Sequence, residues 1–76
     1  MNKARRERLQ IIKDKLEVLQ SEISEIAQEE ADALENMPEG FQDSERGEKM
    51  QNHVDMLADC ESNLNDTIEY LNEVIE

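Results

Sequence analysis

The chain has 76 residues, one cysteine, no tryptophan, a single Tyr and a single Phe, and a formal net charge of −12. A chain of this size forms one small domain at most, and so few aromatic residues argue against a large globular core. The lone cysteine excludes an internal disulfide and fits a reducing compartment such as the cytoplasm, and no apolar run approaches the ~18 residues of a membrane span.

The basic residues are concentrated at the amino end. Residues 1–15 hold six of the eight Lys and Arg, whereas the rest of the chain holds eighteen acids against Arg46 and Lys49. No apolar stretch follows the charged start, so it does not have the form of a signal peptide. We expect the basic cluster to pair with the acidic carboxyl end, and binding of a small anion is the alternative. The cluster consists of Lys3, Arg5, Arg6 and Arg8.

Residues 3–35 have the apolar spacing of a helix. The apolar residues alternate steps of three and four, which places them on one stripe of a helix with a heptad repeat. The background of Glu, Gln, Lys and Ala favours helix as well. The stripe is Leu9, Ile12, Leu16, Leu19, Ile23 and Ile26, continued by Glu30, Ala33 and Met37.

Residues 36–43 are the predicted turn, because the only proline and both glycines of the chain lie in this region or just after it. Asn36 and Glu39 have the spacing of a capping box, and Gly40 can relieve the backbone where the chain reverses. We expect Met37 and Phe41 to fill the bend. Asp43 or Ser44 should cap the helix that follows.

Residues 44–75 repeat the heptad pattern. Folding the chain at Gly40 sets Leu9 against Leu71 and Ile12 against Ile68, so each apolar row meets another. The expected fold is therefore all-α, a single coiled-coil-like antiparallel hairpin over residues 1–76. The second stripe is Met50, Val54, Leu57, Glu61, Leu64, Ile68, Leu71 and Ile75.

Further apolar residues lie outside these stripes, on one flank of the expected hairpin. An exposed apolar patch usually marks a partner surface, and the simplest use is self-association into a four-helix bundle or a larger oligomer. Binding of a different protein is the alternative. The candidate interface residues are Ile11, Val18, Met56, Cys60, Tyr70 and Val74.

No catalytic constellation is present in the sequence. His53 and Cys60 lie seven residues apart and supply two ligands at best, whereas a structural zinc ion needs four. Cys60 has no evident base beside it. We therefore expect a protein that is not an enzyme and holds no metal or cofactor.

The acidic residues near the turn are the strongest functional clue from charge. Such a surface disfavours free nucleic acid as a ligand and suits a basic protein partner, although many proteins are acidic simply for solubility. The candidate partner-binding residues are Glu22, Glu25, Glu29, Asp32, Glu35, Glu45, Glu48, Asp55 and Asp59.

The central sequence "ENMPEGFQDSERGEKM" and the acidic heptads after it resemble a pattern in small uncharacterised proteins of bacteriophages, prophages and mobile elements of Gram-positive bacteria. The resemblance covers residues ~25–75 and includes no catalytic residue. It implies an accessory protein that blocks a bacterial defence system, such as CRISPR or a nucleotide-signalling system. The matching residues are Asn36, Pro38, Glu39, Gln42, Ser44 and Glu45.

Three functions follow from these observations. The first is a non-enzymatic inhibitor that binds a host protein in the bacterial cytoplasm through its acidic surface. The second is a structural oligomerisation module. The third is a sponge that holds a small anionic signal nucleotide between subunits with the amino-terminal basic cluster.

Overall fold

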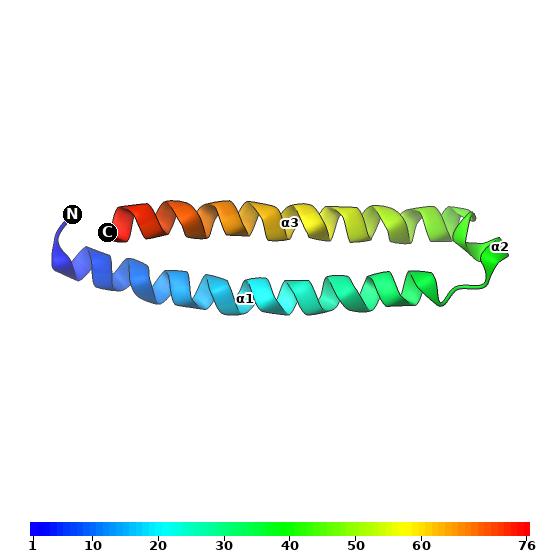
Figure 1. Cartoon of the computed structure of the whole chain (residues 1–76), viewed down its shortest axis with the longest axis horizontal. Helices are drawn as coiled ribbons and strands as arrows, with labels where there is room; N and C mark the ends of the chain where they lie inside the picture. The colour runs from blue at the N-terminus through cyan, green and yellow to red at the C-terminus, as the bar shows by residue number, and fades with distance from the viewer.

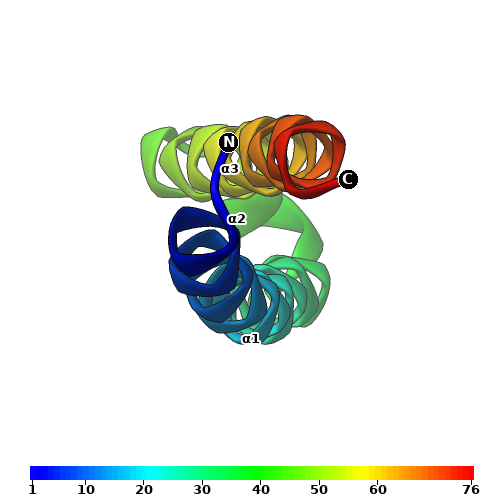
Figure 2. The same cartoon turned by 90° about the vertical axis from the view of Figure 1, so that its left-hand side faces the viewer.

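The computed structural model describes residues 1–76 as an elongated helical hairpin without strands. Helix α1 (Lys3–Glu35) and helix α3 (Glu45–Ile75) pack along their lengths, and the short helix α2 (Glu39–Gln42) lies at the turn (Figure 1). The molecule measures 58 × 14 × 13 Å. Seen from the end of the rod, the two long helices cross rather than lie strictly parallel (Figure 2).

Polar side chains fix where the long helices begin. The Asn2 side chain accepts a hydrogen bond of 2.9 Å from the Arg5 backbone N–H and caps α1. Ser44 caps α3 by accepting from the Gly47 backbone N–H, and its hydroxyl also donates to the Phe41 carbonyl. Both caps satisfy backbone donors that the first turn of a helix leaves without partners.

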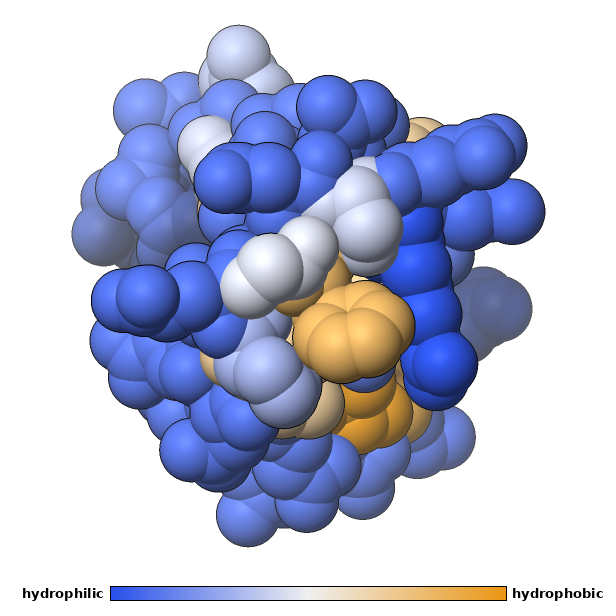
Figure 3. Space-filling model, turned by 90° about the vertical axis from the view of Figure 1, so that its right-hand side faces the viewer, coloured by the Kyte–Doolittle hydropathy of each residue, from blue (hydrophilic) through white to orange (hydrophobic).

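The turn differs in detail from the expectation. Asn36 ends α1 and does not cap α2, whose N-cap is Pro38 without a side-chain hydrogen bond. Met37 is half-buried, but Phe41 is 59% exposed and does not fill the bend. α2, which includes Phe41, is a single turn of helix. Figure 3 shows a small hydrophobic patch in the otherwise hydrophilic surface of the turn end.

Gly40, which was expected to relieve the backbone at the turn, does not need to be glycine, whereas Gly47 does. Gly40 has a helical conformation inside α2, and a Cβ added there would meet nothing within 4 Å. Gly47 is buried in the first turn of α3, where an added Cβ would overlap the backbone carbonyl of Gln42. A glycine is therefore required at position 47, where the first turn of α3 contacts the end of α2, and not at position 40, where the chain reverses.

The packing of α3 agrees with its heptad pattern. Ile68 is 7% exposed and is the one buried apolar residue, and the other members of the stripe are half-buried. The row of α1 that contains Leu9, Leu16 and Ile23 is also half-buried, so this row faces α3 as expected.

The other row of the α1 stripe is not in the seam between the helices. Ile12, Leu19 and Ile26 are 47%, 50% and 54% exposed. The expectation that Ile12 packs on Ile68 inside the seam is therefore wrong. α1 is rotated about its axis, and the adjacent row takes their place. That row is Lys13, Gln20, Ala27 and Leu34.

Hydrogen bonding and side-chain shape account for this rotation. Gln20 Nε2 donates to the Glu61 backbone carbonyl oxygen of α3 at 3.2 Å. The Lys13 side chain is only 16% exposed, because its aliphatic part packs on the seam while Nζ pairs with Glu17 at 3.4 Å. Polar side chains thus occupy part of the α1 side of the seam, and an apolar row is left at the surface.

Candidate interaction surfaces

The rotation of α1 leaves exposed apolar side chains of both long helices on one side of the hairpin. At 100° per residue, the Ile12 row lies about 80° from the seam centre on α1, and the row of Cys60 and Val74 occupies the matching position on α3. We call this surface the apolar flank. It comprises Ile12, Leu19, Ile26, Met56, Cys60 and Val74, all of which are exposed.

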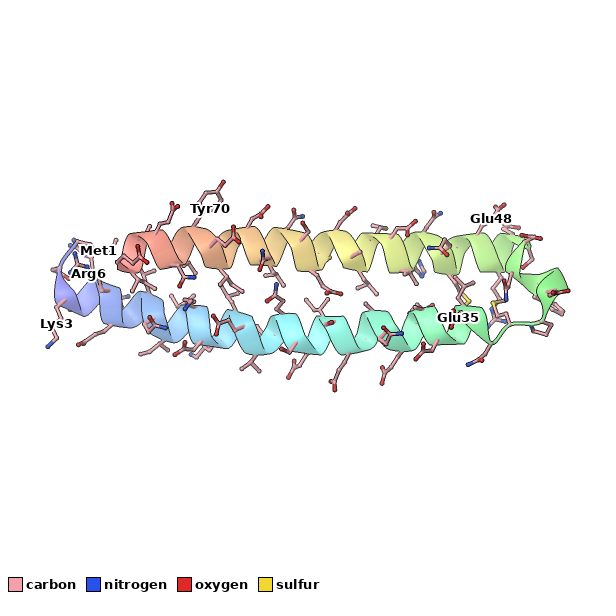
Figure 4. The ribbon with its side chains drawn as sticks, viewed as in Figure 1. Met1, Lys3, Arg6, Glu35, Glu48 and Tyr70 are labelled. Carbon is pink, nitrogen blue, oxygen red and sulfur yellow. The ribbon has the colours of Figure 1, made fainter.

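Three further candidate interface residues lie outside the apolar flank. Ile11 and Val18 are exposed, but the rotation carries them to the outer side of α1, opposite the seam. Tyr70 is 69% exposed and points away from α1 (Figure 4), so it lies at the outer border of the flank. The residues that the sequence missed are Ile12, Leu19 and Ile26, because its pattern assigned them to the seam.

An open hollow lies on the apolar flank between the long helices. It is lined by Glu30, His53, Met56, Leu57 and Cys60. This hollow brings the only histidine and the only cysteine together, but no group of three or more His, Cys, Asp or Glu side chains is arranged to hold a metal ion. The absence of catalysis and of a cofactor stays a prediction from the sequence.

The basic cluster is divided by the fold. Arg5 and Arg8 line a hollow at the free end of the rod together with Met1, Leu9 and Ile12. Lys3 points away from α3 and forms a long ion pair with Glu7 at 3.9 Å, whereas Arg6 lies on the side of α1 that faces α3 (Figure 4). Only two of the four residues, therefore, share one surface.

All nine candidate acidic residues are exposed, but they do not share one face. On α1, Glu22 and Glu29 border the apolar flank. On α3, Glu48 and Asp55 lie on the opposite side, and Glu48 projects away from α1 (Figure 4). The chain forms two ion pairs, both within its first 17 residues, so these carboxylates have no basic partner in the hairpin.

The chain matches no known family model, and neither the curated proteins nor the solved structures contain a match. Neither long helix has a stretch apolar enough to cross a membrane.

Proposed function

We propose that the chain is a non-enzymatic interaction protein. Its acidic turn half, residues 20–60, binds a basic surface of a host protein and inhibits that protein. The source of such a protein would be a bacteriophage or mobile element acting in the bacterial cytoplasm, as the resemblance of residues ~25–75 implies. The target would belong to a defence system.

One observation carries the proposal. Residues 20–60 hold twelve acids and two bases, and all nine candidate carboxylates among them are exposed and lack an ion-pair partner. Unpaired carboxylates on a narrow rod repel one another, and a basic partner removes that repulsion on binding. Charge of this kind raises the association rate and selects against acidic partners.

The experiment compares two variants of α3 with the same change in charge. The test variant carries Glu48→Gln, Asp55→Asn and Asp59→Asn in the turn half, and the control carries Asp66→Asn, Glu69→Gln and Glu73→Gln near the free end. We expect a partner captured from bacterial lysate at low salt to be retained by the wild type and the control and lost by the test variant. Equal capture by both variants would reject the proposal.

A nucleotide sponge is the second candidate, because Arg5 and Arg8 line one hollow with three apolar side chains. Arginine pairs of this kind bind phosphate groups, and apolar neighbours suit a base. A thermal shift of the wild type with a cyclic dinucleotide, lost in Arg5→Ala with Arg8→Ala, would select this function. The neutralised α3 variants would then keep the shift.

A further inference from the structure

We propose that two copies of the chain pack through their apolar flanks as an antiparallel four-helix bundle, with α1 against α1 of the second copy and Leu19 on the two-fold axis. This assembly goes beyond the proposed function and does not depend on it.

The surface area of the hairpin is large enough to accommodate an interface with a second copy. The chain exposes 5959 Å² at a mass of 8.8 kDa. A compact monomer of this mass exposes about 4,800 Å², so the excess is roughly 1,200 Å². A stable interface covers about 800 Å² on each partner, which is less than this excess.

The sequence of α1 is complementary to itself when two copies run antiparallel. On the apolar flank, Leu19 then meets Leu19 of the second copy, and Ile12 meets Ile26. The neighbouring row along the outer border reads Arg8, Lys15, Glu22 and Glu29, two bases followed by two acids. With an offset of one residue from this register, Arg8 meets Glu29 of the second copy and Lys15 meets Glu22.

α3 has the same centre of symmetry. The hydrogen bond from Gln20 to Glu61 places the midpoint of the α1 pattern beside residues 62 and 63 of α3. Around this point Cys60 meets Thr67 of the second copy, His53 meets Val74, and Met56 meets Tyr70. The centres of the α1 and α3 patterns lie within about two residues of each other along the rod. A single two-fold axis can therefore pair the α1 rows and the α3 rows at once.

Charge selects this arrangement over the alternative bundle in which both turns lie at one end. Residues 20–60 carry a net charge of −10, from two bases and twelve acids, and the other residues carry −2, from six bases and eight acids. With the turns together, two −10 halves would lie side by side. The antiparallel bundle places each of these halves against the less charged half of the other copy, which reduces repulsion between like charges.

Cysteine crosslinking tests the register on a Cys60→Ser background. Leu19→Cys should form a disulfide-linked dimer under mild oxidation, because the two-fold axis brings the same residue of both copies together. Ile12→Cys alone should not, because its copies would lie about 21 Å apart along the helices. Ile12→Cys with Ile26→Cys in one chain should crosslink again. Crosslinking of Ile12→Cys alone, or none with Leu19→Cys, would overturn the proposal.

Charge exchange tests the outer border without changing apolar residues. A chain with Arg8→Glu and Lys15→Glu, and a second chain with Glu22→Lys and Glu29→Arg, should each dimerise about tenfold more weakly than the wild type or worse. Mixing the two variants should give a heterodimer, since every border position again meets its opposite charge. Native mass spectrometry separates the species, and two variants that dimerise as well alone as mixed would reject the α1 pairing.

Discussion

α1 and α3 are nearly equal in length, at 33 and 31 residues, but they place their apolar stripes differently. α3 turns its whole stripe toward α1, and its most buried residue is Ile68. α1 divides its stripe, with Leu9, Leu16 and Ile23 in the seam and the Ile12 row on the flank. A helix with one neighbour needs one narrow stripe, whereas a helix in a four-helix bundle needs a wider one. α1 therefore exposes part of its own heptad stripe, whereas the exposed apolar residues of α3 lie outside its stripe.

The largest expected effect comes from truncating the most buried residue of the α3 stripe. Ile68→Ala should lower the free energy of unfolding by about 2–4 kcal/mol, because it removes the most buried apolar side chain. Ile12→Ala is the matched control and should cost roughly 1 kcal/mol in dilute solution, since half of that side chain is already in water. Urea unfolding followed by circular dichroism measures both. Equal costs would place Ile12 in the seam and contradict the rotation of α1.

The second effect concerns how α3 starts beneath the turn. Gly47→Ala should destabilise the hairpin by about 1–3 kcal/mol, because its Cβ would overlap the Gln42 carbonyl group. Gly40→Ala adds the same methyl group in open space within α2 and should stabilise by roughly 0.5–1 kcal/mol, by reducing the entropy of the unfolded chain. Thermal unfolding midpoints should shift in opposite directions, and a shift of the same sign in both variants would reject this view of the turn.

The smallest expected effect compares the two helix caps. Ser44→Ala and Asn2→Ala each remove a side-chain acceptor and should cost about 1 kcal/mol. We expect the Ser44 variant to cost more, because its hydroxyl also donates to the Phe41 carbonyl and ties α2 to α3. Hydrogen exchange of the first-turn amides reports each cap locally. Faster exchange along α1 in the Asn2 variant, with no change along α3 in the Ser44 variant, would contradict the expectation that the Ser44 cap contributes more.

The sequence predicted the course of the fold well because its signals are local. Heptad spacing and the grouping of proline and glycine indicated two long helices that begin and end within one residue of those in the structure. The rotation of α1 was not predictable in this way. The rows of Ile12 and Lys13 adjoin the same central row, and apolar spacing favours the first although Gln20 and the stem of Lys13 pack in the second. Such contacts become evident only when the partner helix is in place.

The candidate surfaces depend on this rotation, so the sequence described their residues better than their positions. It identified exposed acids, but it did not place Glu22 and Glu29 beside the apolar flank and Glu48 on the opposite side. The role of Gly47 was also out of reach, because a glycine in the first turn of a helix has no special meaning until α2 lies against it.

Both ends of the chain lie at the same end of a rod 58 Å long, and the acidic turn lies at the other (Figure 1). A fluorophore, a bead or a further polypeptide joined to either end would therefore be kept away from the turn. The hairpin would then act as a spacer that keeps the acidic turn one rod length away from the point of attachment. For surface immobilisation, attachment at either end would present the same tip to the solution.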